Sequence, residues 1–120
     1  MASDMSRLRV TDQAGITRIS FIDRNILDEA NIQAIGEEIS SLIERAPVPR
    51  ILISFKDVDH LSSAALGTLI KINQGIAARG GQLRLADIDP QIYEVFQITR
   101  LNRLFDIHPT GDEAIKSFTV

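Results

Sequence analysis

The sequence predicts an α/β fold built on a mixed β-sheet, and three patterns carry this prediction. Two strand-like runs open the chain, and apolar strand patterns then alternate with amphipathic helix patterns. The run RILISF, Arg50 to Phe55, is almost continuously apolar, which is typical of a central strand covered on both faces. Strands separated by helices need crossover connections, so we expect a partly parallel sheet with the opening hairpin as its antiparallel edge.

The hairpin is predicted from Leu8 to Val10 and from Ile16 to Ile22, two β-branched, alternating runs separated by Asp12-Gln13-Ala14-Gly15. From Asp28 the apolar period changes to three and four residues, which indicates an amphipathic helix. Pro47 and Pro49 end this helix, because proline lacks an amide donor. Its apolar positions are Ile32, Ile35, Ile39, Leu42 and Ile43, and its polar positions are Glu29, Gln33, Glu37 and Glu44.

A second helix is expected after Ser62-Ser63 and ends near Arg79, where Gly80-Gly81 supplies a residue able to take a positive φ. Proline at a first helical position predicts a further helix from Asp89-Pro90, whose Tyr93 and Phe96 are expected in the core. The remaining elements are expected as strands at Gln82 to Ala86 and Leu104 to Ile107, and a last helix at Asp112 to Phe118.

Length and composition limit the possible functions. The 120 residues fit a single domain, with residues 1 to 6 as a loose lead-in. A net charge of −3 with scattered Lys and Arg argues against nucleic acid as a partner. The absence of cysteine, of an apolar leader and of a spanning apolar stretch predicts a cytoplasmic protein without membrane insertion.

The two adjacent serines occupy different positions on a helical wheel. Ser62 precedes the first turn as a candidate N-cap, whereas Ser63 points outward. Ala65, Leu69, Ile72 and Ile76 form the predicted buried arc, with Leu66 and Ile70 beside it, and Ser63, Gly67, Lys71 and Gln74 lie opposite.

Three interpretations of the serines remain open. Both residues are caps, or one is a nucleophile, or one is a phosphoacceptor at a helix N-terminus. A nucleophile needs a base, and the sequence offers only His60 and His108, without a Gly-x-Ser-x-Gly motif. No phosphate-binding Gly-x-x-x-x-Gly-Lys-Ser/Thr loop occurs, so ATP for any phosphorylation comes from another protein. We expect no enzyme activity, no cofactor and no metal site.

The string VDHLSSAALGTLIKINQGIAARGGQLRL, which begins at Val58, resembles the signature of the STAS domain of bacterial anti-sigma-factor antagonists. The similarity continues through ADIDPQIYEVFQITRLNRLFDIHPTGDEAI and includes the earlier ILDEANIQAIGEEI, so it covers about residues 8 to 118. The resemblance implies a small mixed sheet with helices packed mainly on one face.

The resemblance also implies a protein-protein switch. An unphosphorylated antagonist binds an anti-sigma factor that is also a serine kinase, phosphorylation ends the binding, and a PP2C-type phosphatase restores it. The matching acceptor is Ser63, with Ser62 as the second candidate; Ser62 stands at the family's aspartate position and Ala65 at a glycine position. From the helical wheel, we expect the partner to bind at Ser62, Ser63, Gly67, Lys71 and Gln74. The alternative is a STAS scaffold or regulatory module in a stress-signalling or transporter-associated complex, which binds without being phosphorylated.

Overall fold

The computed structural model describes residues 8–13, 15–22, 29–58 and 61–118. Strands and helices alternate along these residues as the sequence predicts. In chain order the elements are β1 (Leu8–Gln13), β2 (Ile16–Phe21), α1 (Glu29–Arg45), β3 (Arg50–Ser54), α2 (Ser63–Ala78), β4 (Gln82–Ala86), α3 (Pro90–Ile98), the 3-10 helix η2 (Leu101–Arg103), β5 (Asp106–His108) and α4 (Gly111–Ser117).

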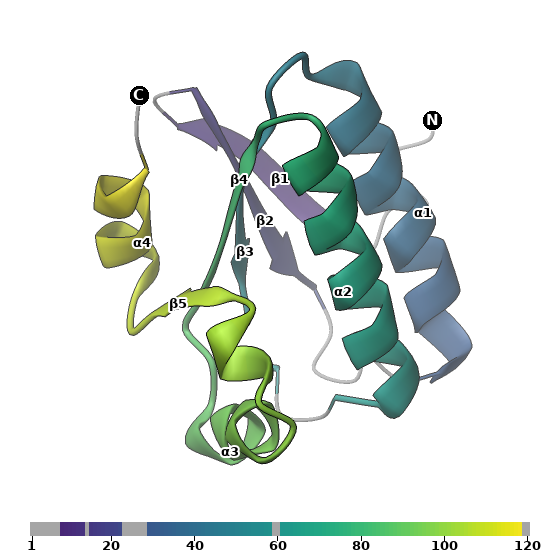
Figure 1. The fold of residues 1–120 in the computed structure, drawn as a ribbon, viewed down its shortest axis with the longest axis vertical. Coiled ribbons are helices and arrows are strands. Elements are labelled where there is room, and N and C mark those ends of the chain that lie inside the picture. Colours follow the sequence, from purple (N-terminus) through teal and green to yellow (C-terminus); the bar gives the residue numbers. More distant parts are fainter. Residues whose placement is uncertain (1–7, 14, 23–28, 59–60, 119–120) are drawn as a thin grey trace.

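The five described strands form one mixed sheet whose spatial order follows the sequence, β1-β2-β3-β4-β5 (Figure 1). The β1–β2 pair is antiparallel, and the three following pairs are parallel. The predicted antiparallel edge on a parallel sheet is therefore confirmed. Strand β3 lies in the middle, where its apolar sequence is covered from both sides.

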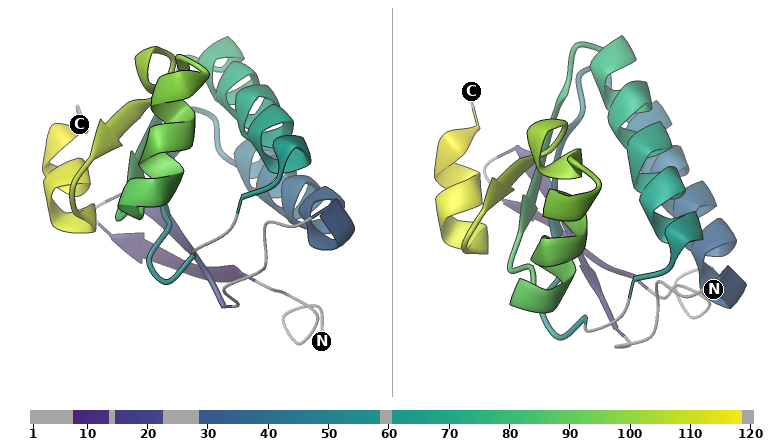
Figure 2. Two further views of the ribbon diagram at one scale, coloured as in Figure 1. Left: turned by 90° about the horizontal axis from the view of Figure 1, so that it is seen from below. Right: turned by 60° about the horizontal axis from the view of Figure 1, so that its bottom comes forward.

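The two faces of the sheet carry different helices (Figures 1 and 2). Alternate β3 residues point to opposite faces, so Ile51 and Ile53 join one apolar cluster and Leu52 joins another. The larger cluster contains residues of α1, α2 and α3, and the smaller one is closed by Ala114 of α4 and by Phe118. The prediction of helices mainly on one face is confirmed, with α4 alone on the other among the described helices.

The opening hairpin is tighter than the sequence suggests. Asp12 and Gln13 were expected in the connection, but they belong to β1, and the register pairs Gln13 with Ile16. Gly15 has a φ of +81°, which glycine adopts without a steric penalty. The β2 strand ends at Phe21, and Ile22 beyond it is 55% exposed.

The predicted strand at Leu104 to Ile107 begins too early. The amides of Leu104 and Phe105 donate to the carbonyl of Leu101, at 3.0 Å each, so the η2 turn uses them before β5 begins at Asp106. Arg100, with a φ of +64°, reverses the chain into this turn. The last helix begins one residue before the predicted Asp112 and ends one residue before the predicted Phe118.

Short polar side chains cap the helices that the sequence analysis placed. The Ser62 hydroxyl accepts a hydrogen bond from the Ala65 amide at 3.1 Å, and Asp89 accepts one from the Gln91 amide at 2.8 Å. Arg79 is the C-cap of α2, and Gly80 follows with the expected positive φ, +70°. The predicted start of α1 at Asp28 lies outside the described residues. None of the described helices has the length and apolar content to cross a membrane.

Helices α1 and α2 approach each other closely at a glycine. A Cβ atom on Gly36 of α1 would lie 2.8 Å from Thr68 Cγ2 of α2. Gly75 of α2 differs, because a Cβ there meets none of the described atoms within 4 Å. Only the first of these helical glycines is required by packing within the chain.

The two serines should contribute differently to stability. Ser62→Ala removes the cap of α2 and should lower the free energy of unfolding by about 1 kcal/mol. Ser63→Ala removes an exposed hydroxyl and should change it by less than about 0.5 kcal/mol. Urea denaturation of both variants tests the assignment, and equal losses would contradict it.

The two helical glycines provide a second stability test. Gly75→Ala should raise the free energy of unfolding by about 0.5–1 kcal/mol, because alanine favours helix and the site is open. Gly36→Ala should lower it by about 1 kcal/mol, because the clash with Thr68 exceeds the propensity gain. Thermal and urea denaturation measure both changes, and a stabilised Gly36→Ala variant would show that the helices are less closely packed.

Candidate functional site

The segment that leads from β3 into α2 is fixed at its start. The buried Ser54 hydroxyl donates to Asp87 Oδ2 at 2.7 Å, which joins the ends of β3 and β4. The Phe55 amide donates to the Ala86 carbonyl at 2.9 Å, and both Phe55 and Val58 are buried. These contacts hold the chain at the carboxyl end of the parallel strands, immediately before α2 begins.

The first turn of α2 separates the two serine hydroxyls, as predicted. Ser62 is half-buried and its hydroxyl accepts from Ala65, so it acts as the cap. Ser63 is the first residue of α2 and is exposed, and its hydroxyl has no hydrogen-bond partner among the described residues. The first turn contains no acidic side chain that would compensate the positive end of the helix dipole. The Ser63 hydroxyl is therefore free to react or to contact a partner.

Below Ser63 the predicted outward positions of α2 are exposed. Gly67, Lys71 and Gln74 all lie on the surface, and a Cβ atom on Gly67 would meet none of the described atoms within 4 Å. We call Ser63, Gly67, Lys71 and Gln74 the α2 stripe. The buried arc of Ala65, Leu69, Ile72 and Ile76 lies opposite, as the wheel predicts. Gly67 leaves bare backbone where another molecule can approach.

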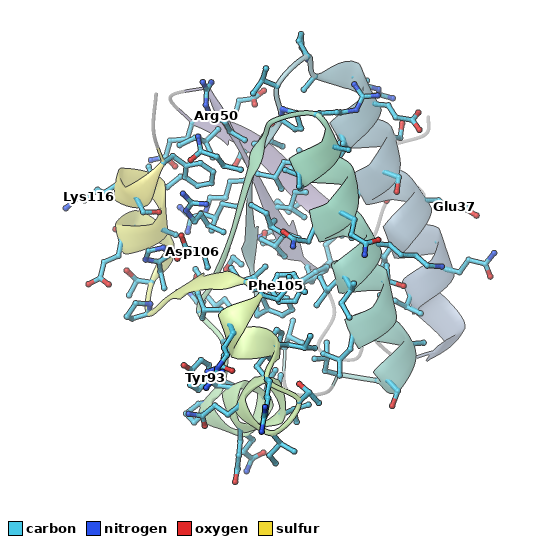
Figure 3. All side chains as sticks on the ribbon, viewed as in Figure 1. Glu37, Arg50, Tyr93, Phe105, Asp106 and Lys116 are labelled. Carbon is cyan, nitrogen blue, oxygen red and sulfur yellow. The ribbon has the colours of Figure 1, made fainter. Side chains whose placement is uncertain are left out.

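A groove next to the α2 stripe was not predicted from the sequence. It has a volume of about 430 Å³ between α1 and α2, and it includes Lys71 of the stripe. Gly36 and Glu37 supply part of the α1 side, and Figure 3 shows Glu37 projecting from that helix. The packing of the two helices, which is close at Gly36 and Thr68, brings α1 beside the stripe. In the sequence, the feature that could have indicated this groove is Gly36, a glycine within an amphipathic helix pattern.

The histidines supply no base for Ser63 among the described residues. His60 lies outside the described residues, and His108 lies on β5, where its Nε2 atom is 3.0 Å from Asp106 Oδ1. Tyr93 also departs from expectation, because Phe96 is fully buried while Tyr93 remains partly exposed. Neither His108 nor Tyr93 belongs to the α2 stripe.

Sequence comparison finds relatives in bacteria. A Thermotoga neapolitana protein named as an anti-sigma factor antagonist homologue is 30% identical over 67 residues, which are 56% of this chain and 59% of that protein. The match thus spans less than two thirds of that relative. The anti-sigma-B factor antagonist of Bacillus subtilis is 26% identical over 98 residues, which are 79% of this chain and 88% of that protein.

Solved structures share the fold. An anti-sigma-factor antagonist (STAS) domain protein from Planctomyces limnophilus superposes with a TM-score of 0.83 at 24% identity, covering 92% of this chain and 96% of that one. SpoIIAA of Bacillus in its phosphorylated form gives a TM-score of 0.69 at 22% identity, covering 91% of this chain and 96% of that one. The STAS domain family matches residues 7–114, so the chain belongs to the STAS domain family.

Proposed function

We propose that this chain is an anti-sigma-factor antagonist that binds its partner through the α2 stripe and is released when Ser63 is phosphorylated. The observation that carries the proposal is the exposed Ser63 hydroxyl, unbonded among the described residues, at the first position of α2. The names of curated relatives support it, as does the family to which the chain belongs. SpoIIAA, which has this fold, has been solved in a phosphorylated form.

The fold tolerates a phosphoryl group at this position. Phosphorylation adds about −1.5 to −2 charges near the positive end of the α2 dipole, where negative charge is favourable. The first turn has no carboxylate to repel the group. The Ser62 cap forms a separate hydrogen bond with Ala65, so it persists when Ser63 is modified. We therefore expect the modification to leave the helix intact.

The same charge disfavours a partner that packs over the stripe. A partner surface complementary to a hydroxyl must desolvate the dianion, which costs several kcal/mol unless a cation pairs with it. Lys71 is two turns further along α2, about 12 Å away by helix rise, too far to neutralise the group directly. In this mechanism the partner kinase supplies ATP, and a PP2C-type phosphatase regenerates the hydroxyl.

Ser62, which stands at the family's aspartate position, can replace an aspartate as a helix cap but not as a negative charge. Its hydroxyl caps α2, which is one task of an aspartate there. It brings no charge, so the kinase must recognise the acceptor without a neighbouring carboxylate. This difference favours, as the second candidate, a STAS scaffold that binds without phosphorylation. Intact-mass measurement with site mapping after incubation with the kinase and ATP separates the two, because a scaffold stays unmodified at Ser63.

Substitution at Ser63 tests the switch. Ser63→Asp should weaken binding to the anti-sigma factor at least about tenfold, because it places an unpaired charge in the interface. Ser63→Ala should bind as wild type and resist the kinase. Calorimetric titration against the cognate anti-sigma factor measures both affinities.

Thr11→Asp is the matched control for added charge. Thr11 is exposed on β1, outside the α2 stripe, so this variant should bind as wild type. Wild-type affinity in the Ser63→Asp variant would refute the switch. An equal loss of affinity in the Thr11→Asp variant would mean that the net charge of the chain, and not the position of the added charge, determines binding.

Substitution at Gly67 tests whether a partner covers the stripe. Gly67→Leu should leave the fold intact, because the site is open, and should reduce anti-sigma factor affinity at least about tenfold by blocking close approach. Thr11→Leu is the control, since Thr11 is exposed on β1, outside the α2 stripe, and this variant should bind as wild type. Unchanged affinity in a folded Gly67→Leu variant would place the interface elsewhere.

A further inference from the structure

One face of the sheet carries a row of arginines on neighbouring strands. Leu52 of β3 belongs to the apolar cluster on the α4 face, and side chains alternate along a strand, so Arg50 points to that face too. The register pairs Arg18 of β2 with Leu52, which places Arg18 on the same face. It also pairs Arg9 of β1 with Ser20, two residues from Arg18. We call Arg9, Arg18 and Arg50 the arginine row.

Helix α4 covers only part of this face. Among the described helices it alone lies on this side, and it packs against β3, β4 and β5 (Figure 2). The edge strand β1 is exposed at every position after Leu8. The part of the sheet that carries the row is therefore open to another molecule.

The arginine row has no acidic partner. None of its members forms an ion pair or a hydrogen bond with the residues that the structure describes. Within β1, β2 and β3 no carboxylate points to this face, since Asp12 lies on the other one. Arg84 on β4 differs, because its Nε atom lies 3.0 Å from Asp106 Oδ2. The row thus gathers three unpaired positive charges in a chain whose net charge is −3.

Two members of the row are partly enclosed by the fold. The Arg18 guanidinium lies against Gly111, the buried first residue of α4, where a side chain would collide with it. Arg50 is half-buried, and its Nε atom is buried without a hydrogen-bond partner in the described part of the chain. Partial burial removes hydration from a cation, which is unfavourable unless an anion compensates it. An anion at the exposed part of these side chains would supply that compensation.

The row crosses the strands diagonally. Arg18 is two residues from Ser20, the partner of Arg9, and Arg50 is two residues from Leu52, the partner of Arg18. Strands lie about 4.8 Å apart and two residues span about 6.6 Å, so neighbouring Cα atoms of the row are about 8 Å apart. In an extended peptide, every second side chain points to the same side, about 6.6 Å from the next. Flexible carboxylate side chains at alternate positions can therefore meet successive arginines.

We propose that this open face binds an extended acidic segment of another protein, in which alternate Asp or Glu residues pair with the arginine row. A guanidinium binds a carboxylate through two parallel hydrogen bonds, which gives such pairs both strength and direction. Nucleic acid fits this face less well, because β1, β2 and β3 present no aromatic side chain on it for base stacking. The surface lies on the opposite face from the α2 stripe, so it is independent of the Ser63 switch.

A fluorescently labelled peptide of alternating Glu and Thr is the probe. Titration with the full chain at low salt should raise its fluorescence anisotropy in a saturable way, and the peptide should shift the amide NMR signals of β1 and β2. A peptide of alternating Gln and Thr has the same length without the charge and should not bind. Affinity for the acidic peptide should fall at least about fivefold between about 50 and about 300 mM salt, because partly exposed ion pairs are screened.

Single substitutions test the row itself. Arg9→Gln and Arg18→Gln should each weaken binding of the acidic peptide at least about threefold, because each removes one charge-assisted pair. Arg103→Gln is the matched control, since Arg103 is exposed on η2, outside the row, and this variant should bind as wild type. Thr11→Asp should also weaken binding, because Thr11 stands opposite Arg18 and the new carboxylate would pair with it.

Several results would overturn the proposal. These are the absence of saturable binding, NMR shifts confined to other elements, and an equal loss of affinity in Arg103→Gln. Tighter binding of an oligouridylate with the same number of charges would also do so, because it would assign the face to nucleic acid. If Arg18→Gln fails to fold, Arg9→Gln decides, since Arg9 is exposed and its removal leaves the core unchanged.

Discussion

Burial of both faces of β3 is the constraint on which the rest of the structure depends. Ile51 and Ile53 on one side and Leu52 on the other are each no more than 2% exposed, so apolar groups must cover both sides of this strand. Helices α1, α2 and α3 cover one side, and α4 with Phe118 covers the other. Because the crossovers run in sequence order, α2 must begin at the carboxyl end of β3. The position of Ser63 follows from this burial.

At the start of α2, two chemically identical side chains have different roles. The Ser62 hydroxyl caps the helix, and the Ser63 hydroxyl is exposed on the surface. Because the cap is at Ser62, the modification proposed at Ser63 would not disturb the start of the helix. Gly67 is also not needed for folding. Helix propensity disfavours glycine there, and no packing contact within the described chain requires it, because the site is open. A glycine at this position fits the proposed partner surface, because it leaves bare backbone for close approach.

The α4 side of the sheet is held by charge as well as by apolar packing. Arg84 connects β4 to Ser117 and Phe118 and stands beside Asp106 of β5. Since the Arg84 side chain is only 15% exposed, these partners compensate the cost of burying its charge. The network ends at His108, on the rim of a hollow that the α2 stripe does not share. The α2 stripe and this hollow are therefore two separate surfaces, lined by different residues.

The sequence by itself determined the alternation of strands and helices, the cap at Ser62, the start of a helix at Asp89-Pro90, and the outward direction of Ser63, Gly67 and Lys71. These features depend on local periodicity and on the chemistry of single residues. Only the tertiary structure decided four other features. These are the 3-10 turn before β5, the tight hairpin, the groove beside α1, and the contact of Asp106 with both Arg84 and His108. Each depends on which distant segments meet or on hydrogen bonds that compete with the strand pattern, and residue spacing along one chain does not encode either.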